Sequence, residues 1–363
     1  MQGFRLLFFR NRNLLLRVKM NIALKTKLQL LIPVLMLGTF SLLSQDIHFS
    51  QFYNAPLTLN PALTAISKGD IRLSGNYRSQ WQAANSPYKT FNVSAEKKFY
   101  DITHDKWWLS AGINLFHDEA GAGNLTNNNV MLAVSITRQI DRYSFLSAGL
   151  VAGFGQRGFD EGNFTYDNNW NGDIFDPTRE SNENFDNTSI FYPEIGAGIN
   201  MRRQWRKSRT KVDFGAGLFH VNQPSQAFYD NDKSKLRMRA SFSALPTIQV
   251  ARNGDVVGAF TSQLQGQYLE ALANIGYRYY ISTQRAKEIA VQLGFGYRFN
   301  AIGDALMPAL EVQYHDLMVG FSWDMNVSEF SEATKHRGGP EIAVRYIIHK
   351  VYPIKLFKAC PLI

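Results

Sequence analysis

Apolar and polar residues alternate along most of this chain with a period of two. Across 107–116, one set of alternate positions reads Trp, Leu, Ala, Ile, Leu, and the other reads Trp, Ser, Gly, Asn, Phe. Across 289–299, the first set is Ile, Val, Leu, Phe, Tyr, Phe, and the second is Ala, Gln, Gly, Gly, Arg. Such alternation over about ten residues predicts a strand whose two faces meet different surroundings.

This pattern recurs fourteen times with no helical repeat and no linker between domains. The predicted strands are 71–78, 90–99, 107–116, 129–137, 144–154, 190–200, 211–219, 240–250, 256–264, 269–280, 289–299, 306–313, 317–325 and 340–348. An even number of strands, each about 9–11 residues long, is typical of an all-β, transmembrane antiparallel barrel of the outer-membrane type. We therefore expect a barrel over 71–348, with about 12 or 16 strands as alternative counts. Pro246 interrupts one predicted strand and indicates a bulge or kink there.

The connections between these strands are sorted by length. If both chain ends face the periplasm, the odd-numbered connections face outside, and most of them are long: 79–89, 117–128, 155–189, 220–239 and 326–339. Most even-numbered connections are short: 138–143, 251–255 and 314–316. The connections 265–268 and 300–305 are short where long ones are expected. Long outer loops and short periplasmic turns are the rule in outer-membrane barrels.

The longest connection, 155–189, is rich in Asp, Asn and Gly and contains Trp170 and Phe175. Loops of this length are usually functional or mobile. One interpretation is that its aromatic residues contact a partner or fold over the barrel mouth. The other is a solvated, variable loop, and the sequence leaves both open.

The polar face of the predicted strands carries seven acids and five arginines. They are Arg72, Arg78, Glu96, Glu194, Asp213, Glu270, Arg278, Arg298, Glu311, Asp324, Glu341 and Arg345. A Lys or Arg on the lipid face costs about 2–4 kcal/mol at bilayer depth, so this face is expected to line the lumen. The mixture of signs suits ion pairs that brace a filled lumen. An open pore also tolerates these charges, and both possibilities remain.

The N-terminus has the pattern of an export signal. An apolar run at 28–43 follows Lys25 and Lys27, and Ser44 provides a small residue for cleavage. We therefore interpret 1–44 as a cleaved signal peptide with Met20 as a candidate true start, and an uncleaved membrane anchor is the alternative. Residues 1–44 hold seven Lys and Arg and no Asp or Glu, so the formal charge of +9 falls to 9 − 7 = +2 after cleavage. The high isoelectric point is thus no argument for nucleic-acid binding.

Motifs for enzymatic chemistry are missing from the sequence. The seven histidines are scattered without metal-ligand spacing, and there is no HExxH, GxSxG or phosphate-binding loop. The single cysteine, Cys360, has no partner for an internal disulfide and is expected to be a quiet thiol. We therefore expect no catalytic site, no metal and no cofactor.

A basic run is the clearest charged motif. It comprises Arg202, Arg203, Arg206, Lys207 and Arg209 and is expected in a periplasmic connection. There it would dock an acidic partner or lipid headgroups. A solvated turn is an equally good interpretation.

Several short segments resemble one known family. The mature N-terminus at 46–62 reads DIHFSQFYNAPLTLNPA, and YRSQW at 77–81 is followed by SPY at 86–88. Other matching segments are FHVNQP at 219–224, WDMNVS at 323–328, GGPEI at 338–342 and the terminal Cys360-Pro361. Together these segments, which span nearly the whole mature chain, resemble the PorP/SprF family of Bacteroidetes outer-membrane proteins. Pro340 and Trp323 depart from that pattern, because a bulkier residue and Tyr are expected there.

The resemblance implies a non-enzymatic barrel in the outer membrane that takes part in type IX secretion. It implies work with the periplasmic ring components of that machine. It also implies help in exporting or anchoring one secreted protein, such as a gliding adhesin held by its C-terminal domain. Outer-membrane lipid is the remaining expected partner, and a role with nucleic acid is not implied.

The N-terminal segment 45–70 lacks a strand pattern, and residues 349–363 are expected to form a periplasmic tail. Within 45–70, the candidates for a plug or a partner contact are Phe49, Gln51, Phe52, Tyr53, Asn60 and Pro61. Asn60-Pro61 is a turn signal. Such a segment fits inside the lumen or across the periplasmic mouth, and simple packing against the barrel wall is the alternative.

Two other functional classes remain as rivals to a secretion barrel. A passive pore or small-solute transporter would conduct steadily in a planar bilayer, whereas a barrel with an occupied lumen would not. A barrel hydrolase needs a Ser and a His brought together at the rim and would turn over lipid. Identification of co-purifying partners would separate a core secretion role from service to one adhesin.

Overall fold

The computed structural model describes residues 46, 48–80, 88–99, 106–121, 123–176, 178–179, 187–205, 207–228, 234–284, 287–299, 305–327 and 338–349. The predicted signal peptide, Met20, Cys360 and all but His349 of the predicted tail therefore lie outside the described residues. No helix among the described residues is long and apolar enough to cross a membrane.

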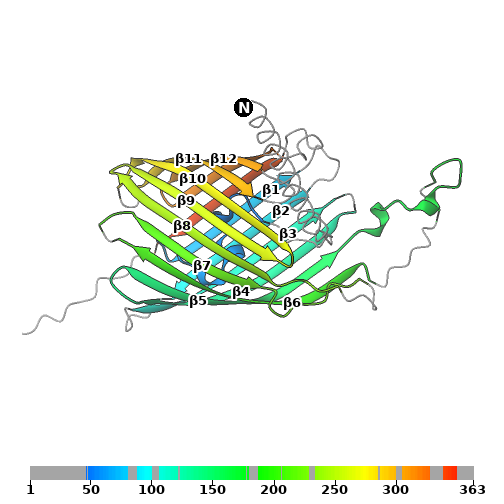
Figure 1. The fold of residues 1–363 in the computed structure, drawn as a ribbon, viewed down its shortest axis with the longest axis horizontal. Coiled ribbons are helices and arrows are strands. Elements are labelled where there is room, and N and C mark those ends of the chain that lie inside the picture. The colour runs from blue at the N-terminus through cyan, green and yellow to red at the C-terminus, as the bar shows by residue number, and fades with distance from the viewer. Residues whose placement is uncertain are drawn as a thin grey trace, which may run out of the picture. The chain divides into compact units, whose positions relative to one another are not determined.

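The described residues form fourteen antiparallel strands, as the sequence predicted (Figure 1). They are β1 (Ile71–Gln80), β2 (Tyr88–Phe99), β3 (Trp107–Ala120), β4 (Leu125–Gln139), β5 (Ser144–Gly158), β6 (Ser189–Gln204), β7 (Lys211–Phe219), β8 (Arg239–Ala251), β9 (Gly254–Gln265), β10 (Tyr268–Ser282), β11 (Ile289–Phe299), β12 (Ala305–Tyr314), β13 (Leu317–Asn326) and β14 (Gly339–Ile348). Each strand pairs with its neighbours in sequence, and β1 pairs with β14. The sheet is therefore a closed barrel without a free edge, as a β-structure in lipid must be.

The barrel has two distinguishable mouths. The mouth at which β1 begins and β14 ends, where Ile71 pairs with Ile348, is called the terminal mouth below. The opposite mouth carries the two longest connections, 159–188 and 220–238, and is called the loop mouth.

Burial along the strands is the reverse of that in a water-soluble protein. Large apolar side chains such as Leu150, Phe191 and Leu293 point outward, and Phe191 is 74% exposed. Alternate positions hold buried polar groups, and Asp324 and Glu341 are completely buried. The outer surface is thus suited to hydrocarbon, and the ionic side chains turn toward the lumen, as the alternation predicted.

Many strand boundaries differ from the predictions by one or two residues, and those of β3 to β6 differ by up to four. The ladder between β3 and β4 continues to Ala120 and Leu125, so the connection expected at 117–128 shrinks to 121–124. Gly121 and Asn124 provide positive φ angles in this short turn. β6 continues to Gln204, so Arg202 and Arg203 lie in a strand and not in a connection.

Pro246 is accommodated without the bulge predicted there. Positions 245 and 246 lack partners in the β8–β9 ladder, but the register is the same on both sides, from Ala244–Phe260 to Thr247–Val257. The irregularity in β8 lies instead between Gln249 and Ala251, next to the turn into β9. Pro246, which has no backbone N–H, therefore interrupts the hydrogen bonds between β8 and β9 without changing their register.

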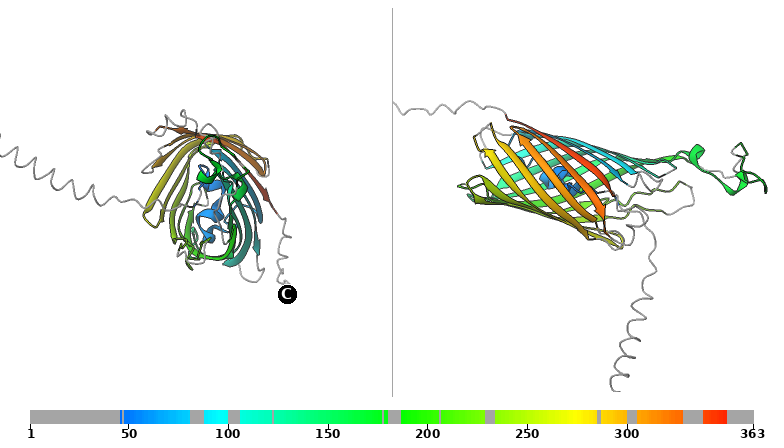
Figure 2. Two further views of the ribbon diagram at one scale, coloured as in Figure 1. Left: turned by 90° about the vertical axis from the view of Figure 1, so that its right-hand side faces the viewer. Right: turned by 90° about the horizontal axis from the view of Figure 1, so that it is seen from above.

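The described residues before β1 form three short helical turns inside the ring of strands, as the end-on view shows (Figure 2). They are η1 (Phe52–Asn54), α2 (Pro56–Leu59) and η2 (Pro61–Leu63). Proline begins both α2 and η2, where its missing N–H costs nothing, and the Asn60 side chain accepts the N–H of Ala62.

The loop between β5 and β6 extends away from the barrel in the described part (Figure 1). It contains η4 (Glu161–Asn163) and η5 (Asp167–Asn169), and Trp170 pairs with Phe175 in an isolated β-bridge. Both aromatic side chains are exposed, at 55% and 45%. They do not cover the barrel mouth, which was one of the predicted alternatives.

Candidate functional site

The described part of residues 46–70, called the lumenal segment below, crosses the barrel from one mouth to the other. At the loop mouth, the Asp46 backbone N–H donates to Gln265, the last residue of β9, at 2.8 Å. At the terminal mouth, the Asp70 N–H donates to the carbonyl of Ile348 at 2.9 Å. The segment therefore runs through the lumen from the loop mouth to the terminal mouth, and the strands pack around it.

A buried charge cluster holds the first residue of the segment at the loop mouth. The Asp46 carboxylate lies 2.5 Å from Nε2 of His220 and 3.2 Å from Nε of Arg239. The other ring nitrogen of His220 lies 2.9 Å from the Glu194 carboxylate. The imidazole is thus placed between two carboxylates.

These contacts change the protonation of both Asp46 and His220. Burial works to raise the pKa of the Asp46 carboxyl, but His220 and Arg239 outweigh it and hold the pKa well below its usual range. Burial works to lower the pKa of His220, but Asp46 and Glu194 outweigh it and raise the pKa to about 9. At neutral pH the histidine is therefore a cation in a true ion pair.

Glu341 and Asp324 bind the next turn of the segment. The two oxygens of Glu341 accept the backbone N–H groups of Ser50 and Gln51, at 2.7 and 2.8 Å. The Ser50 hydroxyl donates to Asp324 at 2.6 Å. A carboxylate that accepts two adjacent backbone N–H groups fixes the backbone itself, so the segment is positioned and not merely enclosed.

Arginines complete this buried network. Arg78 lies 2.5 Å from Asp324 and donates to the carbonyl of His48, and Arg298 lies 3.0 Å from the same carboxylate. Arg298 also lies 3.2 Å from Glu270, which contacts the His48 ring at 2.6 Å. Buried charges need such partners because desolvation of each ion is costly.

The middle of the segment fits against a row of glycines. A Cβ at Gly149 would lie 2.5 Å from the Pro61 carbonyl, and one at Gly217 would lie 2.6 Å from the Leu59 oxygen. The Asn60 side chain donates to the carbonyl of Ile199 at 2.8 Å. Glycine in a strand often marks a place where another backbone approaches closely, and it does so here.

Apolar residues of the segment pack on the lumenal faces of β9, β10 and β12. Phe52, Leu59 and Leu63 form a buried cluster with Leu272 and Met307. The half-buried Tyr53 packs against this cluster. Phe49 makes an edge contact with Phe116 of β3, with ring centroids 6.4 Å apart. The apolar core of this protein is therefore inside the barrel.

The predicted plug residues all lie within this arrangement. Phe49, Gln51, Phe52, Asn60 and Pro61 are almost completely buried. Tyr53 is half-buried and lines a cavity at the terminal mouth. The structure places them inside the lumen and not merely across the periplasmic mouth. Contact with a partner protein remains a prediction.

The predicted basic patch is not a single surface. Arg202 faces the lumen and pairs with Asp213 at 2.8 Å, and Arg209 pairs with Asp255 at 2.8 Å. Arg203 lies over the Trp205 ring, Lys207 is exposed, and Arg206 lies outside the described residues. The prediction that all five residues lie in one periplasmic connection was wrong. β6 continues four residues beyond its predicted end, to Gln204, and the Arg202 side chain in this extension points into the lumen.

Sequence reasoning missed several residues of the site. Asp46 and Arg239 were not singled out, although Asp46 begins the first family-like segment and Arg239 begins a strand on its lumenal face. The glycines of β5 and β7 were not singled out either. The alternation of apolar and polar residues predicts that a side chain points into the lumen, but it does not predict which residue that side chain contacts there.

The family-like segments meet at this site. Arg78 comes from YRSQW, His220 from FHVNQP, Asp324 from WDMNVS and Glu341 from GGPEI, and each contacts the N-terminal segment.

The closed pairing of the strands, the apolar exterior and the ion-paired lumen define the chain as a transmembrane β-barrel of the outer-membrane type with an internal segment. Its family follows from sequence: a family model described as "Type IX secretion system membrane protein PorP/SprF" matches residues 41–346. The chain belongs to that family.

Comparison with solved structures finds matches of low sequence identity. CymD, a monoaromatic hydrocarbon channel, matches with a TM-score of 0.48 and 11% identity, over 85% of this chain and 96% of CymD. The Ralstonia pickettii toluene transporter TbuX matches with a TM-score of 0.47 and 10% identity, over 84% and 96%. A Pseudomonas aeruginosa FadL homologue matches with a TM-score of 0.48 and 10% identity, over 80% and 93%. A comparison with curated protein sequences gave no match.

Proposed function

We propose that this chain is a non-enzymatic outer-membrane component of type IX secretion that helps to export or anchor a secreted protein and does not conduct solutes. The observation that carries the proposal is the occupied lumen. The described part of residues 46–70 passes through it and is held by hydrogen bonds to buried charged side chains of β1, β13 and β14. An open passive pore needs an unobstructed path, and a charge-bound backbone segment in the lumen argues against one.

The proposal places the terminal mouth in the periplasm and the loop mouth outside. The support is the connection lengths, since the two longest connections share one mouth. In this orientation Asp46, the first described residue, lies at the outer mouth. We further propose cleavage after Ser44. Intact-mass measurement of the membrane form is expected to show a chain that begins at Gln45, and retention of residues 1–44 would contradict the cleavage.

The two mouths offer different surfaces to partners. At the loop mouth, Trp170 and Phe175 hold exposed apolar area on a small hairpin, a feature that is common at protein-binding surfaces. At the terminal mouth, Arg203 and Lys207 remain exposed cations beside Trp205. We assign the first surface to the secreted protein and the second to the periplasmic ring of the secretion machine.

The test is affinity purification of the tagged chain from its native outer membrane, with mass spectrometry of the partners. Two double variants serve as controls for each other, because each changes one mouth. Trp170→Ser/Phe175→Ser is expected to lose a large secreted protein and keep the periplasmic proteins. Arg203→Ser/Lys207→Ser is expected to do the reverse. Purification of the barrel alone from cells that secrete actively would overturn the proposed role.

A further inference from the structure

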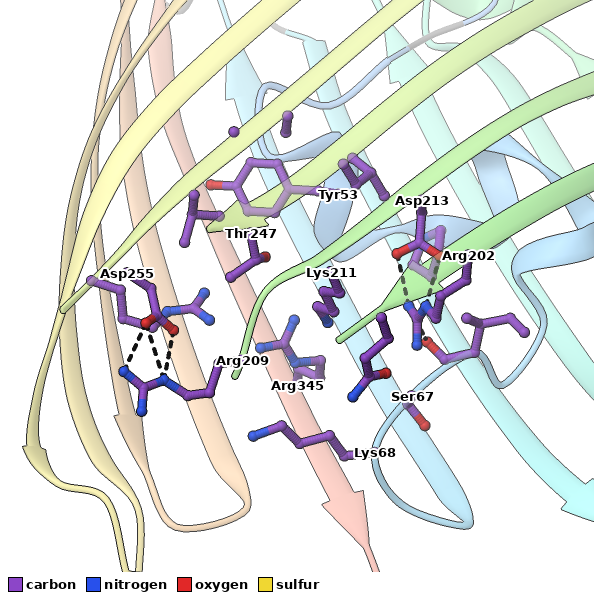
Figure 3. Close-up of a pocket in the computed structure, with 18 of the residues that line it drawn as sticks. Tyr53, Ser67, Lys68, Arg202, Arg209, Lys211, Asp213, Thr247, Asp255 and Arg345 are labelled. Carbon is purple, nitrogen blue, oxygen red and sulfur yellow. Dashed lines mark hydrogen bonds and ion pairs between the residues drawn. The ribbon is translucent and has the colours of Figure 1, made fainter. Parts of the chain in front are cut away.

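A cavity of about 560 Å³ lies between the lumenal segment and the terminal mouth. Its floor includes Tyr53 and Leu63 of the segment, and its wall comes from the terminal-mouth ends of the strands (Figure 3). The side chain of Lys68, at its rim, is 58% exposed, so the cavity communicates with solvent. Its volume falls within the range of small-molecule sites.

The cavity lining has a strong excess of positive charge. Eight Lys and Arg side chains line it, against two aspartates, Asp213 and Asp255. Those aspartates are already engaged by Arg202 and Arg209, as the dashed lines in Figure 3 show. At the loop mouth, by contrast, the positive charges of His220 and Arg239 are balanced by Asp46 and Glu194.

Of the other six cations, three pair with acids that lie outside the cavity lining. Arg72 pairs with Glu96, Arg278 with Glu311 and Lys68 with Glu288.

For the remaining three cations, no ion pair within 4 Å is found among the described residues, and Asp70, Asp213 and Glu311 act on them only through longer-range attraction. These three are Lys98, Lys211 and Arg345. The Lys98 ammonium donates to the carbonyl of Ser67, and Arg345 donates to Asn54 at 3.2 Å. Neither contact neutralises a charge. Figure 3 shows Lys211 and Arg345 between the Arg202–Asp213 pair and the Arg209–Asp255 pair.

We propose that this cavity binds an organic phosphate, with Lys211 and Arg345 as its main ligands and Lys98 as a third cation. Enclosed cations without counter-charges are unfavourable, and an anion that enters from the terminal mouth relieves the imbalance. A phosphate monoester carries close to two negative charges at neutral pH and three strong acceptor oxygens, which suits one guanidinium fork and two ammonium groups.

The remaining wall indicates that the phosphate is part of a larger molecule. The cavity exceeds the size of an inorganic anion, and Trp108, Phe145 and Leu245 give it apolar area. A lipid headgroup and a soluble phosphate share the required chemistry. This inference does not depend on the proposed role in secretion, because a binding measurement needs no partner protein.

The test is isothermal titration of the full mature chain in detergent with three probes: inorganic phosphate, tripolyphosphate and a short-chain phosphatidic acid. Phosphatidylcholine of the same chain length is the control ligand, since its phosphodiester is shielded by choline. We expect the phosphatidic acid or tripolyphosphate to bind and the phosphatidylcholine not to bind. Tighter binding of the phosphatidic acid identifies a lipid headgroup as the source, and tighter binding of tripolyphosphate identifies a soluble phosphate.

The decisive variant is Lys211→Gln/Arg345→Gln, expected to weaken binding by about tenfold or more through loss of two charge-assisted contacts. Lys97→Gln is the matched control, because Lys97 neighbours Lys98 on β2 but points outward. Heat-dependent migration on gels establishes that each variant folds, and the charge-conserving Lys211→Arg/Arg345→Lys is expected to retain binding. Equal affinity in the wild type and the double glutamine variant would overturn the proposal. So would tighter binding of an acidic peptide, or the absence of heat with every phosphate at millimolar concentration.

Discussion

At the scale of single residues, buried carboxylates do the positioning in this molecule. Glu341 accepts two consecutive backbone N–H groups, and Asp324 joins a serine hydroxyl to two arginines. The charges of the polar face were predicted to point inward because lipid excludes them. Their partners were not predictable, since Arg78 and Asp324 are far apart in sequence and the path of the lumenal segment decides which of them meet.

Asp324→Asn is expected to destabilise the barrel strongly, because it leaves Arg78 and Arg298 without their shared counter-charge. Loss of one partner in a buried ion pair costs about 3–5 kcal/mol. Unfolding in urea after reconstitution measures this change. The control is Glu119→Gln, which removes the more exposed pair between Lys89 and Glu119 at 3.7 Å and is expected to cost about 1 kcal/mol or less. Equal effects of the two variants would contradict the positioning role of Asp324.

The His220 ion pair predicts a pH dependence at the loop mouth. Its pKa in the folded chain, about 9, lies above the ordinary histidine value of 6.5. A raised pKa means that the stabilisation is complete below about pH 6.5 and is lost as the pH rises through about 9. The free energy of unfolding is therefore expected to fall between these values, as protonated His220 loses its charge between Asp46 and Glu194.

Urea titrations at a series of pH values measure this fall. His220→Gln keeps a polar side chain but cannot titrate, so its stability is expected to change less over the same pH window. An identical fall in the wild type and in His220→Gln would show that other groups are responsible.

At the scale of elements, the lumenal segment and the strands β5 and β7 are fitted to each other. Glycine normally weakens a strand, and from sequence alone Gly149 and Gly217 indicate only a crowded lumenal face. The structure gives the reason, since the backbone of Leu59 and Pro61 occupies the space that a side chain would need. The three helical turns could not be placed from sequence, because their apolar residues follow neither a period of two nor a helical repeat.

Gly149→Val/Gly217→Ala is expected to displace the segment while the barrel remains closed, because the new side chains meet backbone at 2.5–2.6 Å. Overpacking of this kind costs about 1–3 kcal/mol. Faster protease cleavage within 46–70, with an unchanged barrel on gels, would report the displacement. Gly75→Ala is the control, because its Cβ would lie 3.9 Å from the nearest atom, on the outer face of β1. Resistance of the double variant to protease would contradict the close fit.

The ends of the strands were the least predictable elements. β6 runs to Gln204 because Arg202 finds Asp213 directly across the ladder in β7. A run of basic residues in isolation resembles a polar turn, and only the cross-strand partner shows that it continues a strand. The connection between β3 and β4 was also predicted too long, because polar residues at the start of β4 resemble a loop but continue the ladder with β3.

At the scale of the whole molecule, alternation was sufficient to predict a closed barrel of fourteen strands. An alternation of period two can be recognised without knowledge of the tertiary structure. Because charged side chains are unfavourable in lipid, the charged face of each strand must point into the lumen. The route of residues 45–70 was left open between the lumen, the periplasmic mouth and packing against the barrel wall. The structure resolves the route: the segment begins at one mouth and ends at the other, with its apolar side chains forming the core.

The cationic cavity was also beyond sequence reasoning. Its excess of positive charge comes from lysines and arginines on separate strands. The sequence does not show that these side chains line the same cavity, because that depends on barrel closure and on the position of the lumenal segment. Lys98 and Lys211 were absent from the predicted lumenal charges, yet both line this space.

Conductance in planar bilayers tests the central claim, that the barrel's own N-terminal segment occupies and closes its lumen. The wild-type mature chain is expected to give no steady current, and Gly149→Val/Gly217→Ala is expected to give stable openings because the segment is displaced. A steady ohmic current through the wild type, unchanged in that double variant, would contradict the account.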